Sequence, residues 1–161
     1  MKKLLFVLLV LPFIWVGCEK PEPTPLPLGE LKLTGTWEWT ETSWASPQEP
    51  LTPETEGYSL HLTLTEDNKF TYYHNCVAVA YGSVTQGVWK DTTTLNQEEY
   101  PYMDFYDHVS SATTTSFYEL YKKSDYEHTM TTYLAPKLGG GKTLKWKKLN
   151  DVEVKELFEK K

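Results

Sequence analysis

Apolar and polar side chains alternate with a period of two in several segments between residues 33 and 149. In the first of them, Leu33, Trp37 and Trp39 share one face, whereas Glu38 and the threonines from Thr34 to Thr42 share the other. A period of two over this length is typical of a strand with one buried face. The pattern therefore predicts a half-buried strand over 33–42.

Two more alternating segments, 58–64 and 70–76, predict a β-hairpin with one of two registers. A three-residue loop with Asn68 in the left-handed region places the leucines of the first segment opposite the inward aromatic residues of the second. A two-residue turn would slip the pairing by one residue and send every side chain to the other face. We favour the three-residue loop, which turns His74 and Cys76 toward the interior.

Six further segments are expected to be strands, and turn residues separate most of them. They cover residues 84–90, 100–107, 114–121, 126–134, 143–149 and 152–158. Residues 114–123 also fit a short helix, and residues 152–161 have partial helical character. Eight or nine strands joined by short turns predict an all-β fold, an antiparallel up-and-down barrel, because closure removes exposed strand edges.

The N-terminus has a different pattern, in which Lys2 and Lys3 precede an apolar run over 4–16. This order is typical of a secretory signal peptide, and the run is shorter than the roughly 20 residues of a membrane-spanning helix. Its end resembles the lipobox of bacterial lipoproteins, except that Trp15 stands where that motif usually has leucine. The resemblance implies cleavage before Cys18 and acylation of that residue, and two or more acyl chains give a stable membrane anchor.

Three regions follow from these patterns: a signal peptide over 1–17, a proline-rich linker over 18–31 and a barrel domain over 32–161. The linker has proline at every second position from Pro21 to Pro27. Such a sequence favours extended polyproline II, a semi-rigid spacer.

Composition narrows the classes of partner. Without Lys2 and Lys3, 14 lysines face 22 acidic residues, a net charge of −8, and the chain contains no arginine. An acidic chain is a poor match for nucleic acid, and the lack of arginine disfavours bidentate recognition of anions. If Cys18 is acylated, Cys76 has no partner for an intramolecular disulfide.

A family resemblance is carried by Gly35-Thr36-Trp37, which looks like the Gly-x-Trp signature of lipocalins. Together with residues 62–70 and Gly87-Val88-Trp89, it is similar to the lipocalin-like domains of bacterial lipoproteins. The resemblance spans about residues 31–158 and is strongest before residue 90. It implies a barrel whose closed end is plugged by Trp37, located at the bacterial cell envelope on the outer membrane.

Residues that could support chemistry are few. His74 and Cys76 lie two apart, a spacing compatible with zinc, but no second cluster of ligands accompanies them. Asp107, His108 and Ser110 include the residue types of a catalytic triad, yet neighbours on a strand face opposite ways and no Gly-x-Ser-x-Gly motif is present. We therefore expect no catalytic residue, no metal, no cofactor and no enzymatic activity.

The inward aromatic residues suggest a binding function instead. An eight-stranded barrel is just wide enough to be filled by its side chains or to hold one small ligand. The leading hypothesis is a pocket for a small hydrophobic or amphipathic molecule, walled by Trp39, Tyr58, Tyr72, His74, His128 and Met130. The alternative is a filled barrel that contacts an envelope protein or a glycan through its outer surface, as an adhesin, scaffold or protease inhibitor. An enclosed volume well below about 300 Å³ would favour the alternative.

Overall fold

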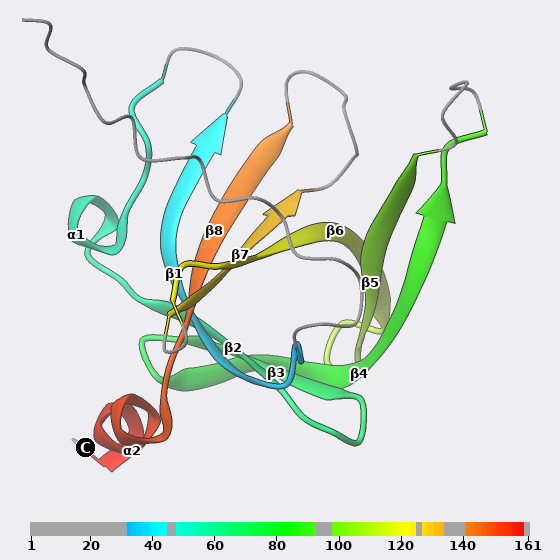
Figure 1. Cartoon of the computed structure of the whole chain (residues 1–161). Coiled ribbons are helices and arrows are strands. Elements are labelled where there is room, and N and C mark those ends of the chain that lie inside the picture. Colours follow the sequence, from blue (N-terminus) through cyan, green and yellow to red (C-terminus); the bar gives the residue numbers. More distant parts are fainter. Residues whose placement is uncertain (1–31, 45–47, 93–97, 125–126, 134–140, 160–161) are drawn as a thin grey trace, which may run out of the picture.

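The computed structural model describes residues 32–44, 48–92, 98–124, 127–133 and 141–159, which form a closed β-barrel (Figure 1). Its strands follow one another around the barrel in chain order, and every neighbouring pair is antiparallel. They are β1 (Gly35–Trp44), β2 (Leu60–Leu64), β3 (Lys69–His74), β4 (Val77–Lys90), β5 (Glu99–Asp107), β6 (Ala112–Lys122), β7 (His128–Tyr133) and β8 (Lys142–Lys148). The predicted all-β, up-and-down barrel is confirmed, with eight strands, and residues 114–121 are a strand.

Two helices accompany the barrel: α1 (Pro53–Glu56) before β2 and α2 (Asp151–Glu159) after β8. The expected strand over 152–158 is therefore wrong. Asn150 begins α2, because its side-chain oxygen accepts hydrogen bonds from the backbone nitrogens of Val152 and Glu153 at 3.0 Å each. The Glu153 carboxylate accepts in return from the Asn150 nitrogen at 2.8 Å, which completes a capping box.

The β2–β3 hairpin has the predicted register. Leu62 pairs with Tyr72, and Leu64 pairs with Phe70. Asn68 has a φ of 58°, which is the left-handed conformation that the three-residue loop requires. These pairs bring leucines and aromatic rings to the same face of the sheet, so the hairpin supplies one wall of the barrel interior.

The next turn corrects two expectations. Strand β3 ends at His74, and Asn75 and Cys76 form a turn with φ values of 49° and 62°. Two consecutive left-handed residues are typical of a two-residue hairpin turn. Cys76 therefore does not share a strand face with His74. His74 pairs with Leu60 on the face of Tyr72, as predicted, but at the end of the strand its side chain is exposed. Strand β4 begins at Val77, seven residues earlier than predicted.

A bulge in β1 changes which residues face the interior. The pairing with β8 shifts between Trp39 and Glu41. A bulge adds one residue to one strand and reverses the alternation beyond it. Thr42, expected on the polar face, is consequently 3% exposed, and its hydroxyl oxygen accepts a hydrogen bond from Trp39 Nε1 at 2.9 Å.

One end of the barrel is closed by Trp37, which is fully buried. Its Nε1 donates a hydrogen bond to the Leu33 carbonyl oxygen at 2.7 Å, so the segment before β1 covers the ring. Lys148 lies beside the same ring, with Nζ 5.4 Å from the ring centroid and 2.8 Å from the Lys32 carbonyl oxygen. The barrel is thus sealed at the end where β1 begins.

Helix α2 lies outside the barrel (Figure 1), where its Phe158 ring packs on Tyr73 of β3 with 5.1 Å between centroids. The neighbouring outward residue on β2, His61, is 0% exposed. Neither of its ring nitrogens makes a hydrogen bond to another described residue, and Glu38 Oε1 is 3.6 Å from Nε2. The outer face of β1–β3 therefore forms a second buried layer, separate from the interior of the barrel.

Candidate functional site

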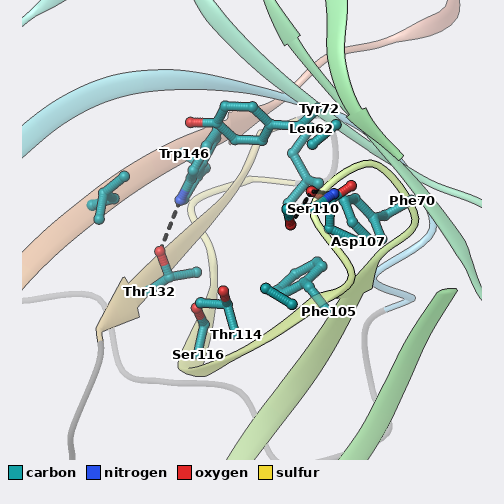
Figure 2. Close-up of a pocket in the computed structure, with 13 residues that line it drawn as sticks. Leu62, Phe70, Tyr72, Phe105, Asp107, Ser110, Thr114, Ser116, Thr132 and Trp146 are labelled. Atoms are coloured by element: carbon teal, nitrogen blue, oxygen red, sulfur yellow. Dashed lines mark hydrogen bonds between the residues drawn. The ribbon is translucent and has the colours of Figure 1, made fainter. Parts of the chain in front are cut away.

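The candidate site is a cavity of about 310 Å³ inside the barrel (Figure 2). Residues from the seven strands β2–β8 and from the β5–β6 turn line it: Leu62, Phe70, Tyr72, Ala80, Phe105, Asp107, Ser110, Ala112, Thr114, Ser116, Thr132, Leu144 and Trp146. The volume lies at the lower end of the range of about 300–1,000 Å³ that ligand pockets span. The cavity is open to solvent beside the β5–β6 turn, where Ser110, Ala112 and Thr114 are exposed. At this end, the side chains of the barrel fill its interior only partly.

The apolar wall of the cavity is built from rings that hold one another in place. Tyr72 and Trp146 meet edge to face with 6.2 Å between centroids, and Phe70 and Phe105 do so at 5.1 Å. Edge-to-face pairs at these distances are favourable beyond the area that they bury. The rings consequently give the cavity a rigid shape before any ligand enters.

A polar wall stands opposite, where Figure 2 shows Thr114, Ser116 and Thr132 below Tyr72 and Trp146. Thr132 Oγ1 accepts a hydrogen bond from Trp146 Nε1 at 3.0 Å. The hydroxyls of Thr114 and Ser116 make no side-chain hydrogen bond to any other residue that the structure describes. Because a hydroxyl both donates and accepts, these two groups can bind the polar end of a ligand.

Tyr72 adds a hydroxyl to the apolar side. Burial, and secondarily the nearby Tyr58, raises the pKa of Tyr72 to about 12. The phenol is therefore neutral at any physiological pH and keeps its proton to donate. Its side chain combines a large apolar surface with one polar atom, which suits an amphipathic ligand.

Asp107 is a structural carboxylate at the edge of the cavity. It accepts hydrogen bonds from the Val109 and Ser110 backbone nitrogens at 3.0 and 3.1 Å, and from Ser110 Oγ at 2.6 Å (Figure 2). The Ser110 hydroxyl, followed by the Val109 nitrogen, lowers the pKa of Asp107. The group is therefore ionised and holds the β5–β6 turn. His108 contacts the rings of Tyr81 and Tyr106 instead.

The six residues predicted to wall the pocket lie in three places. Tyr72 lines the cavity. Trp39, Tyr58 and His74 form a continuous stack beside it, with centroids 5.6 and 4.8 Å apart. His128 is half-buried at the start of β7, and Met130 is fully buried in the core opposite Trp146. The structure thus brings one of the six to the cavity and groups three others next to it.

The polar wall was missed in the sequence because its signal is weak. Residues 113–116 read Thr-Thr-Thr-Ser, so no contrast between apolar and polar positions reveals which of them face inward. The strand register shows it: Thr114 pairs with the inward Phe105, and Ser116 pairs with the inward Met103. The inward orientation of Thr114 and Ser116 therefore follows from their pairing with β5 and not from the local sequence pattern.

Within the described ranges, no group of three or more His, Cys, Asp or Glu residues is arranged to hold a metal ion. In the same part of the chain, neither helix has the length and apolar character needed to cross a membrane. The lipidation prediction at Cys18 and the predicted signal peptide and linker lie outside the described residues.

Comparison with known proteins does not assign the chain to a family. No family model matches the chain, and no curated protein or solved structure gives a significant match.

Proposed function

We propose that this chain is a lipid-anchored carrier or receptor of the bacterial cell envelope that binds one small, mainly apolar molecule inside its barrel. The observation that carries the proposal is the cavity of about 310 Å³ between a wall of aromatic rings and a row of hydroxyls. A completely filled barrel would leave no such space. The proposal includes no enzymatic step, since the ionised Asp107 is occupied by the turn that it holds.

The charges around the cavity define the polar end of the ligand. Among the described residues no lysine lines the cavity, the chain has no arginine, and the carboxylate of Asp107 lies at the edge of the cavity. An anionic head group would thus meet a like charge and no compensating cation. We infer that the ligand carries a neutral hydroxyl, carbonyl or amide group that binds Thr114, Ser116 or Tyr72.

Two probes of equal chain length test this inference. We expect 1-decanol to raise the melting temperature of the full-length chain and to appear as a bound mass in native mass spectrometry. Decanoate, which differs by its charge at pH 7.5, is expected to bind at least about tenfold more weakly, a difference of about 1.4 kcal/mol. Equal binding of both, or of neither, would contradict the proposed chemistry of the pocket.

A pair of variants on β6 tests the location. Ser116→Leu adds an apolar side chain inside the cavity and is expected to abolish decanol binding. Thr113→Leu makes the same kind of change on the exposed outer face of this strand, and we expect it to bind decanol like the wild type. Loss of binding in both variants would show that the effect is not specific to the cavity.

The proposed anchoring depends on Cys18 and on the resemblance to lipocalin-like lipoproteins of the outer membrane. We expect Cys18→Ser to move the protein from the membrane fraction to the soluble fraction and to prevent incorporation of radiolabelled palmitate. Cys76→Ser is the matched control, and it should change neither result. A Cys18→Ser protein that stays acylated and membrane-bound would exclude this part of the proposal.

A further inference from the structure

A continuous group of aromatic side chains covers the outer face of β4–β7, on the other side of the barrel wall from the cavity. Ring centroids are 5.8 Å apart for Trp89 and Tyr100, and 6.2 Å apart for Trp89 and Phe117. Tyr102 and Phe117 are 6.2 Å apart, and Phe117 stacks on Tyr133 at 6.1 Å. We call these five residues the outer aromatic patch.

The strand register makes the patch broad and even. Tyr102, Phe117 and Tyr133 are direct cross-strand neighbours, and Gly87 continues their row on β4. The ring of Tyr102 lies over Gly87, where an added methyl group would be 2.6 Å from the ring. Trp89 is 43% exposed, although tryptophan is highly buried on average in folded proteins. The patch is thus a platform of rings at the surface, in which Trp89 is exposed and the other four rings are half-buried.

Carboxylates and hydroxyls border these rings. Glu98 accepts a hydrogen bond from the Tyr100 hydroxyl, and Glu119 accepts from Tyr121 and, at 3.5 Å, from Tyr133. Burial first, and then Glu119, raises the pKa of Tyr121 and of Tyr133. These phenols are consequently neutral donors at neutral pH, and the patch presents acceptors and donors side by side.

A polar groove of about 540 Å³ continues from Tyr121 across the outer face of β7, β8 and β1. Its side chains include three threonine hydroxyls, from residues 40, 129 and 131. Both of its lysines are already paired with carboxylates: Lys145 Nζ is 2.9 Å from Glu41, and Lys123 Nζ is 3.1 Å from Glu127. The groove therefore offers hydroxyl groups for hydrogen bonds, and its two lysines are already neutralised by carboxylates of the same chain.

We propose that the outer aromatic patch and this groove bind a neutral oligosaccharide. A sugar ring has an apolar face of C–H groups that stacks on aromatic rings, and a hydroxyl rim that requires donors and acceptors such as Glu119, Tyr121 and the groove threonines. An anionic partner would find no arginine in the chain and no unpaired lysine among the described residues that line the groove. This site is independent of the cavity inside the barrel, so it does not rest on the lumen proposal.

The test is a printed array that carries neutral oligosaccharides of glucose, mannose, xylose, galactose and N-acetylglucosamine beside sialylated and sulfated glycans. The full-length chain in detergent micelles is expected to bind one or more neutral oligosaccharides. Titration with the best of them should show at least about tenfold weaker affinity for Trp89→Ala and Phe117→Ala, because removal of a central aromatic side chain typically costs that much. Tyr81→Ala removes an exposed ring from β4 outside the patch and should leave affinity unchanged.

Several results would overturn the assignment. These are binding to acidic glycans alone, no binding to any neutral glycan, or equal loss of affinity in Tyr81→Ala and Trp89→Ala. A dimer that Trp89→Ala dissociates would instead assign the patch to a second copy of the chain. Trp89→Phe keeps a ring at this position, so it should retain most of the affinity even if Phe117→Ala does not fold. Ser116→Leu should bind the oligosaccharide normally, which separates this site from the cavity.

Discussion

Replacing Gly82 by alanine is expected to destabilise the barrel by about 3–5 kcal/mol, at the upper end of what single substitutions cause. A methyl group at this position would lie 1.9 Å from the Tyr106 carbonyl oxygen and 3.2 Å from the Phe70 ring. The carbonyl belongs to β5, which pairs with β4 along its length, so it cannot retreat without breaking the ladder. Urea denaturation followed by tryptophan fluorescence should show a lower midpoint with a similar slope.

The same substitution at Gly57 is the matched control. Nothing lies within 4 Å of a methyl group there, but Gly57 has a φ of 72°. Only the cost of placing alanine in the left-handed region applies, about 1–2 kcal/mol. A Gly82→Ala protein as stable as Gly57→Ala would mean that β4 and β5 lie farther apart than the structure shows. The Gly82→Ala substitution would also affect the cavity, because Gly82 pairs with Asp107, which lines the cavity.

The free energy of unfolding is expected to fall as the pH rises from 10 to 12, with Tyr72 as one of several tyrosines that contribute. Its pKa is about 12 in the folded protein against 10 for the exposed group. Below pH 10 the phenol is neutral in both the folded and the unfolded chain, so its ionisation does not yet lower the free energy of unfolding. Between pH 10 and 12 it ionises in the unfolded chain but not in the folded one. The loss from Tyr72 alone is roughly 3 kcal/mol, at about 1.4 kcal/mol per pKa unit.

Urea titrations at pH 9, 10, 11 and 12 measure this loss. Tyr72→Phe should flatten the decline, because phenylalanine has no proton to release. Tyr81→Phe removes the hydroxyl of a tyrosine that is 54% exposed and should flatten it much less. Burial also raises the pKa of Tyr118, Tyr121 and Tyr133, so part of the decline will persist in both variants. An identical pH dependence in Tyr72→Phe and the wild type would contradict the burial of the Tyr72 hydroxyl.

Fold class and hairpin register were predictable because both follow from local patterns. Asn68 can adopt the left-handed conformation that a three-residue loop needs, and the leucines of β2 require aromatic partners on the same face. The bulge at β1 was not predictable, since nothing in the alternation before Thr42 signals an extra residue. Helix α2 had a signal that was overlooked, the capping box of Asn150 and Glu153.

The candidate site was less accessible from the sequence than the fold. Tyr72 could be identified because it alternates with inward residues in a clear hairpin. Thr114 and Ser116 could not, because they lie in a run of small polar residues whose orientation depends on pairing with β5. Cys76 was predicted inward on the assumption that β3 continues to this residue, but the turn at Asn75 ends the strand first. Side chains at the end of a strand are therefore the least predictable part of such a pocket.

The seal at Trp37 determines how a tethered barrel would be oriented. In an up-and-down barrel, connections alternate between the two ends, so the start of β1 and the β5–β6 turn lie at opposite ends. A chain attached to lipid through Cys18 would be held by the sealed end, and the cavity, which reaches Ser110 in that turn, would face away from the bilayer. Such a protein would capture its ligand from the aqueous side of the membrane and not extract it from the leaflet to which it is fixed.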